Sequence, residues 1–147
     1  MEVASDFEGA YYVNIMHDVS SDKIYYLTND LLDSLSSYNY ETKRYNKLYD
    51  LEKINSIDKY DIFLSGPVSI IEVNNDDAIN DKTLIVFRDS FASSIAPLLA
   101  MDVKKLVLID TRYINSDLLG NYVDFNNADI LFMYSCDILN NSFSFKW

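Results

Sequence analysis

Three short apolar segments in the second half of the chain constrain its fold more than any other feature. They are Thr83 to Phe87, Lys105 to Ile109 and Ile130 to Tyr134. Continuous apolar runs of this length are typical of strands that are buried on both faces. The connections between them are short, and each is long enough for one helix. This order predicts βαβ units and a parallel sheet.

Helical patterns lie in both connections. In the first, apolar side chains recur at helical spacing along one face, at Phe91, Ile95, Leu98 and Leu99. In the second, a helix is predicted from Ser116 to about Val123, with Asn115 or Ser116 as its cap. The predicted fold class is therefore α/β, a three-layer sandwich with a mainly parallel sheet.

The first half of the chain is less regular. Alternation predicts a short strand at Ile24 to Leu27, and VSIIEVNN predicts another. Ser34 to Asp58 is polar and rich in tyrosine, and is either partly helical after Tyr45 or an extended loop. DKYDIFLSGP indicates an ordered turn or short helix that ends at Gly66-Pro67. We expect a single domain over residues 1–147, clearest at 58–140 and less regular at 1–57.

Charge and composition exclude several classes of function. The net charge of −11 would repel DNA, RNA and anionic membrane surfaces. With Cys136 as the one cysteine and His17 as the one histidine, a disulfide framework and a Cys/His metal site are excluded. Glycine-rich phosphate loops and calcium loops are absent, so we predict neither a metal nor a cofactor.

Targeting signals are also missing from the sequence as given. Its apolar runs stay well below the roughly 18 to 20 residues that span a bilayer, so we predict no membrane-spanning segment. A signal peptide is not apparent either, which fits a cytoplasmic protein or a chain trimmed of its N-terminus. The residues alone do not indicate the localisation or the oligomeric state.

Polar groups follow all three predicted strands. They are Arg88-Asp89-Ser90, Asp110-Thr111-Arg112 and Ser135-Cys136-Asp137. Ligands of open α/β sheets bind outside the carboxyl ends of the strands. If the three strands are neighbours, these groups share one edge of the sheet.

Ser90 and Asp89 allow two interpretations. One is helix capping, in which either side chain accepts a hydrogen bond from an N–H of the first turn. The other is nucleophilic catalysis by Ser90, with nearby backbone N–H groups stabilising an oxyanion. The two roles are compatible.

The other candidates have simpler interpretations. Asp110 resembles a phosphoacceptor only in its position, because the rest of an acidic phosphorylation pocket is missing. Arg112 is expected to pair with a carboxylate and to order its loop. His17 lies in a polar turn, where a single histidine is more often an ordinary residue than a catalytic one.

Five segments in one order carry a resemblance to a known family: DKYDIFLSGP, IEVNN, LIVFRDSFASSIAPLLA, VLIDTRYI and DILFMYS. Together they resemble the C-terminal half of the DHHW family, which is similar to the SGNH-hydrolase-like domains of alginate O-acetylation proteins. The resemblance covers about Asp58 to Ser135. It implies an SGNH-hydrolase-like (flavodoxin-like) fold.

The resemblance also implies site residues. Ser90 stands at the position of the family's candidate nucleophile, with Asp89 before it and Phe91 after it. Asp110, Arg112 and Tyr113 match a D-x-R-Y block. Gly66 matches one glycine of a pair, and Pro67 replaces the other. Arg88 departs from the usual Gly or Lys.

One element of the family pattern is missing. The Asp and His that would activate the serine belong to an upstream Asp-His-His-Trp segment, and this sequence has none. Its one tryptophan is Trp147. A serine without a base is a poor nucleophile at neutral pH. The chain therefore resembles the C-terminal portion of such a protein, or a degenerate member.

Two classes of function remain at this point. The first is an O-acyltransferase or esterase that acts on an extracytoplasmic polysaccharide, little active as this chain alone. Its partners would be the polysaccharide and an acyl donor, and the resemblance implies an extracytoplasmic or membrane-anchored protein. The second is a non-catalytic structural or carbohydrate-binding domain, whose many tyrosines would stack on sugar rings.

Overall fold

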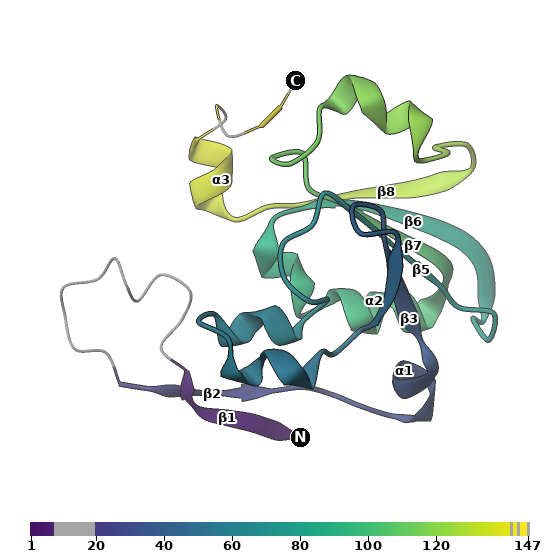
Figure 1. The fold of residues 1–147 in the computed structure, drawn as a ribbon. Coiled ribbons are helices and arrows are strands. Elements are labelled where there is room, and N and C mark those ends of the chain that lie inside the picture. The colour runs from purple at the N-terminus through teal and green to yellow at the C-terminus, as the bar shows by residue number, and fades with distance from the viewer. Residues whose placement is uncertain (8–19, 142, 144, 147) are drawn as a thin grey trace.

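The strands of the computed structural model form two separate sheets (Figure 1), and the structure describes residues 1–7, 20–141, 143, 145 and 146. The smaller sheet is the antiparallel pair β1 (Glu2–Phe7) and β2 (Asp22–Tyr25). The larger sheet has six strands in the order β4-β3-β5-β7-β6-β8. Its strands are β3 (Ser36–Asn39), β4 (Arg44–Lys47), β5 (Ile70–Asn74), β6 (Asn80–Arg88), β7 (Val103–Ile109) and β8 (Ala128–Met133).

Helices are short in the described residues. The α-helices are α1 (Asp30–Ser34), α2 (Ala96–Asp102) and α3 (Cys136–Asn140). The 3-10 helices are η2 (Leu51–Asn55), η3 (Lys59–Ile62), η4 (Ser90–Ser93) and η5 (Ser116–Asn121). The second predicted helix is thus a 3-10 helix, and Asn115 caps it by accepting from the N–H of Asp117 at 2.9 Å.

The prediction of a mainly parallel sheet is wrong, because the large sheet is mixed. β6 pairs in parallel with β7 on one side and with β8 on the other. β5 pairs antiparallel with β7, and β3 pairs antiparallel with both β5 and β4. Only the three strands recognised from their apolar runs are parallel, so the parallel part is one half of the sheet.

The three parallel strands are neighbours, with β6 between β7 and β8. Ile85 of β6 stands opposite Val107 of β7 and Ile130 of β8. Since the strands run in the same direction, their carboxyl ends meet at one edge of the sheet. That edge holds all three of the polar groups that follow them.

Both faces of the sheet are covered (Figure 1). On one face, Ala96 and Ala100 of α2 pack with Val86 and Leu106 in the larger apolar cluster. On the other, Leu119 of η5 packs with Ile85 and the rest of a smaller cluster. The α/β class is therefore correct, although 3-10 helices and loops supply much of the outer layers.

The helix expected after β6 is divided. η4 ends at Ser93 and α2 begins at Ala96, with a proline at its first turn. Pro97 lacks an N–H and cannot donate to the carbonyl of Ser93, so the hydrogen-bond pattern of one continuous α-helix is interrupted here. Phe91 and Ile95 are consequently exposed and do not share a buried face with Leu98.

The polar segment from 34 to 58 holds β3, β4 and η2. The prediction of a partly helical segment after Tyr45 is met only by the 3-10 helix η2, and the alternative of an extended loop is wrong. Tyr38 and Tyr45 face each other across β3 and β4, with ring centroids 5.1 Å apart. Cross-strand aromatic pairs stabilise such hairpins. The strands therefore form on tyrosine contacts rather than on an aliphatic run.

β8 is the edge of the large sheet and is less buried than predicted. Ile130 is half exposed and the side chain of Phe132 is 69% exposed.

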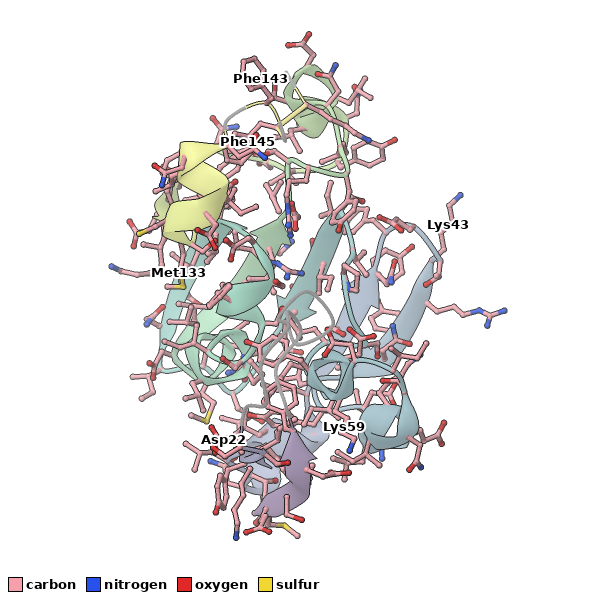
Figure 2. The ribbon with its side chains drawn as sticks, turned by 90° about the vertical axis from the view of Figure 1, so that its left-hand side faces the viewer. Asp22, Lys43, Lys59, Met133, Phe143 and Phe145 are labelled. Carbon is pink, nitrogen blue, oxygen red and sulfur yellow. The ribbon has the colours of Figure 1, made fainter. Side chains whose placement is uncertain are left out.

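At the other end of the molecule, Lys59 lies beside β1 (Figure 2) and forms an ion pair with Asp6. Among the described helices, none is long and apolar enough to cross a membrane.

Candidate functional site

A cavity of about 330 Å³ opens beside the carboxyl end of β6. Four of the sequence-predicted site residues line it, namely Gly66, Ser90, Arg112 and Tyr113. Its other lining residues are Asp58, Tyr60, Asp61, Phe63, Pro67 and Ser93. The remaining candidates, Arg88, Asp89 and Asp110, are buried and do not line this cavity. The structure thus divides the predicted set into a cavity wall and a buried charged group.

Asp89 is the cap of η4. Its Oδ1 accepts a hydrogen bond from the N–H of Phe91 at 3.0 Å, and its Oδ2 accepts from the N–H of Ser135 at 2.7 Å. The first bond is the capping interaction that the sequence predicts. The second joins the end of β8 to the end of β6. Asp89 therefore fixes the turn that carries Ser90.

Ser90 follows immediately, as the first residue of η4. It is partly exposed and lines the cavity, and its hydroxyl forms no hydrogen bond with any described residue. A free hydroxyl at a cavity wall is accessible to a ligand. The N–H of Phe91, however, already donates to Asp89, so it is not available to stabilise an oxyanion.

Asp110 and Arg112 form a two-point ion pair at the end of β7. Arg112 donates from Nε to Oδ1 at 2.9 Å and from Nη2 to Oδ2 at 2.6 Å. The hydrogen bonds to Asp110 raise the pKa of Arg112 above its usual value. The predicted pairing of Arg112 with a carboxylate is confirmed. Its guanidinium also lies 5.4 Å from the ring centroid of Tyr113, within cation–π range.

Arg88 is the least usual residue of the site. Its side chain is 99% buried, with 1% of its surface exposed. Nη1 donates to the hydroxyl of Ser93 at 2.8 Å and to the carbonyl of Asp89 at 3.4 Å. Burial lowers the pKa of Arg88, and the nearby charge of Asp110 counteracts this. The apolar run that precedes Arg88 in the sequence does not indicate that its guanidinium is buried.

Gly66 lies in a strained turn on the cavity wall. Leu64, Ser65 and Gly66 all have positive φ, of 60°, 60° and 95°. A Cβ at Gly66 would lie 3.0 Å from Oδ1 of Asp61. Non-glycine residues with positive φ are uncommon and often occur at functional sites. A side chain at position 66 would therefore be unfavourable for two reasons, namely the positive φ of the backbone and the nearby carboxylate of Asp61.

Sequence reasoning missed several contributors. Tyr60 lines the cavity and donates its hydroxyl to the carbonyl of Phe91 at 3.2 Å. Asp61 also lines it, and burial, together with the charge of Asp58, raises the pKa of Asp61. Both belong to DKYDIFLSGP, which the sequence indicates as an ordered turn or short helix and as part of the family resemblance, with no role for either residue. Ser93 also lines the cavity. It lies three residues after Ser90, which is one turn of the 3-10 helix η4.

Other candidates are not part of the site. Cys136 and Asp137 are exposed, at the start of α3. His17 lies outside the described residues. Within the described part of the chain, no group of three His, Cys, Asp or Glu side chains is arranged to hold a metal. A larger cavity of about 660 Å³ lies against β4, α1 and η2, and no predicted site residue lines it.

Comparisons with known proteins give a family and a fold. The family model described as DHHW protein matches residues 4–109. No curated protein matches the sequence. The structure is similar to that of Bacillus cereus PatB1 with a sulfonyl adduct, with 24% identity, a TM-score of 0.65 and 86% of this chain covered. A second PatB1 structure matches with 24% identity and a TM-score of 0.62 over 84% of this chain.

The length of these proteins differs from that of this chain. The match covers 47% of the first PatB1 chain and 43% of the second, so this chain spans less than half of their length. A DHHW family protein from Eubacterium siraeum also matches, with 17% identity and a TM-score of 0.49 over 80% of this chain and 39% of that one. The PatB1 matches show a shared fold.

Proposed function

We propose a function on the basis of the protein family. The chain belongs to the DHHW protein family, whose model matches residues 4–109. In this proposal the chain is an SGNH-like domain of an O-acyltransferase or esterase. Ser90 is the nucleophile and carries the acyl group. The substrate is an extracytoplasmic polysaccharide, and the chain has little activity by itself.

The position of Ser90 is the observation that carries this proposal. Its unbonded hydroxyl lines a cavity at the carboxyl end of the central parallel strand β6. Ligands of α/β sheets bind at such ends. One structure with the same fold holds a sulfonyl adduct, and sulfonyl groups attach to nucleophilic atoms. A serine hydroxyl in this position has the chemistry that such an adduct requires.

The proposed reaction divides acyl transfer into two steps. Ser90 Oγ attacks the carbonyl carbon of an acyl ester, the alcohol of the donor leaves, and the serine proton passes to a base. A sugar hydroxyl or water then attacks the acyl-serine and releases Ser90. No described residue within hydrogen-bonding distance of Ser90 can act as that base. The base must come from another group, which is why we propose low activity for this chain.

Asp89, Asp110, Arg112 and Tyr113 have supporting roles in this proposal. Asp89 fixes the turn of Ser90 through two backbone hydrogen bonds. Asp110 orients Arg112, which lines the cavity together with Tyr113. Arg112 and Tyr113 would contact the substrate. Asp89 and Asp110 are buried and would hold Ser90 and Arg112 in position without touching the substrate.

An external base tests the role of Ser90. Hydrolysis of p-nitrophenyl acetate is measured with increasing imidazole for the wild type, Ser90→Ala and Ser94→Ala. Ser94 is a matched control, since it lies four residues away and does not line this cavity. We expect a rate that rises with imidazole and exceeds the buffer reaction in the wild type and Ser94→Ala alone. Equal rates for all three proteins at every imidazole concentration would contradict the proposal.

A non-catalytic carbohydrate-binding domain is the second candidate. It is favoured by the aromatic rings of Tyr60, Phe63 and Tyr113 around the cavity, beside the carboxylates of Asp58 and Asp61. Aromatic rings stack on sugar faces, and carboxylates accept hydrogen bonds from sugar hydroxyls. Calorimetry with soluble polysaccharides would show saturable binding that Tyr113→Ala weakens and Ser90→Ala leaves unchanged.

A further inference from the structure

The guanidinium of Arg88 is only partly used. Nη1 donates to Ser93 and to the carbonyl of Asp89. Nε and Nη2 are buried and have no hydrogen-bond partner among the described residues. Buried donors without a partner are rare in native proteins, because water no longer satisfies them. Two such donors on one charged side chain indicate a group that belongs there.

Arg112 shows which group fits. Its Nε and Nη2 hold the two oxygens of Asp110, at 2.9 and 2.6 Å. Nε and Nη2 of Arg88 are the same pair of atoms. This edge of a guanidinium is a planar fork whose two N–H groups match the two oxygens of a carboxylate. The site therefore contains one filled fork and one empty fork.

The two nearby carboxylates form no hydrogen bond with the Arg88 fork. Asp110 is a favourable electrostatic neighbour of Arg88, but its oxygens accept from Arg112. The oxygens of Asp89 accept from the N–H groups of Phe91 and Ser135. The fork therefore has no partner among these carboxylates.

The fork lies close to the cavity beside Ser90. Ser93, which Arg88 Nη1 contacts, lines that cavity. Tyr60 lines it as well and interacts electrostatically with Arg88. Tyr60 is held there by one exposed hydrogen bond to the carbonyl of Phe91. The guanidinium of Arg88 is thus one hydrogen bond away from a residue of the cavity wall.

Charge limits the ligand to a monoanion. Arg88 and Arg112 carry two positive charges, and Asp89 and Asp110 carry two negative charges, so these four side chains together are neutral. The cavity wall adds Asp58 and Asp61. A dianion such as phosphate would bring more negative charge than this surrounding favours. We propose that the Nε–Nη2 fork of Arg88 binds a small monocarboxylate that enters from the cavity beside Ser90.

The Nε–H signals of arginine in nitrogen-15 NMR test this directly. The chain has three arginines, Arg44, Arg88 and Arg112, so three signals are expected. Sodium acetate is titrated against sodium chloride at equal ionic strength. We expect acetate to shift the Arg88 signal to a plateau in the millimolar range, and to leave that of exposed Arg44 in place. Arg88→Lys, which keeps the charge and loses the fork, should weaken acetate binding at least about tenfold.

Two further arms separate this proposal from the others. Ser90→Ala should bind acetate as the wild type does, so a failure of Ser90 as nucleophile would not affect the result. Inorganic phosphate should shift the Arg88 signal less than acetate at the same concentration. An Arg88 signal that acetate does not move, or moves no more than chloride does, would overturn the proposal. The wild-type titration decides this even if Arg88→Lys does not fold.

Discussion

The carboxylate of Asp89 joins the ends of two parallel strands, because its Oδ2 accepts the backbone N–H of Ser135 at 2.7 Å across 46 positions of sequence. Its other oxygen caps the turn that begins at Ser90. One side chain thus fixes the edge of the sheet and the orientation of the candidate nucleophile.

Replacing Asp89 should destabilise the protein. Asp89→Ala removes a cap and a second charge-assisted bond from a buried site, and should lower the free energy of unfolding by about 2 to 4 kcal/mol. Asp89→Asn keeps an amide oxygen for one of the two N–H groups and should lose less. Urea unfolding measures both. Asp137→Ala, at an exposed position in α3, is the control, and an equal loss there would contradict this role of Asp89.

Asp110 should matter more for stability than its ion-pair partner. It is fully buried beside two arginines, Arg88 and Arg112. Asp110→Ala leaves both guanidinium groups without its charge and should cost about 3 to 5 kcal/mol, the range for a broken buried pair. Arg112→Ala leaves Asp110 near Arg88 and should cost less. Thermal or urea unfolding of the two variants, and of the double variant, would contradict this if Arg112→Ala proved the more harmful.

Gly66 should not tolerate a side chain. Gly66→Ala places a Cβ at a φ of 95° and 3.0 Å from Asp61 Oδ1, and should destabilise the protein by about 1 to 3 kcal/mol. Gly120 is a matched control, because a Cβ there meets no atom within 4 Å. Gly120→Ala should leave stability nearly unchanged in the same unfolding experiment. Similar values for the two variants would show that the turn at Gly66 can adapt.

Asp61 should make stability fall as the pH rises. Burial and the charge of Asp58 raise its pKa in the folded state, so the folded protein binds this proton more tightly than the unfolded chain does. The stability that the protonated form contributes is present below the unfolded pKa of about 4 and is lost as the pH rises through the folded pKa. Asp61→Asn removes this loss.

The comparison with Asp61→Asn is made by urea unfolding at several pH values. The variant should be more stable than the wild type at neutral pH, and the difference should shrink as the pH falls towards 4. The control is Asp117→Asn, which is equally isosteric and lies in η5 away from the cavity. A difference between Asp61→Asn and wild type that stays constant with pH would contradict the raised pKa.

The parallel half of the sheet could be predicted because its signal is local. Ile85, Val107 and Ile130 belong to apolar runs whose length and composition indicate buried strands, and they stand opposite one another. The antiparallel half could not. β3 and β4 are held by tyrosine contacts, which a polar, tyrosine-rich sequence does not distinguish from a loop. Strand direction in β5 depends on partners that its own residues do not specify.

Part of the cavity lining could be predicted from the sequence, and the arrangement of the site could not. Strand ends pointed to Asp89, Ser90, Asp110 and Arg112, and the structure brings these ends together. The sequence does not show which polar groups are buried. Arg88 lies between an apolar run and Asp89, and an exposed arginine could occupy the same position in the sequence. The role of Asp61 depends on its approach to Gly66 across a turn with three positive φ values, which no local pattern predicts.

Covalent labelling of Ser90 tests the central claim most directly. The protein is treated with phenylmethylsulfonyl fluoride in the presence of imidazole as external base, and the modified peptide is located by mass spectrometry. If Ser90 is the nucleophile, one sulfonyl group attaches to the peptide that carries it, fluoride leaves, and Ser90→Ala stays unmodified while Ser94→Ala reacts like the wild type. Modification confined to other residues, or equal labelling of Ser90→Ala, would contradict the account.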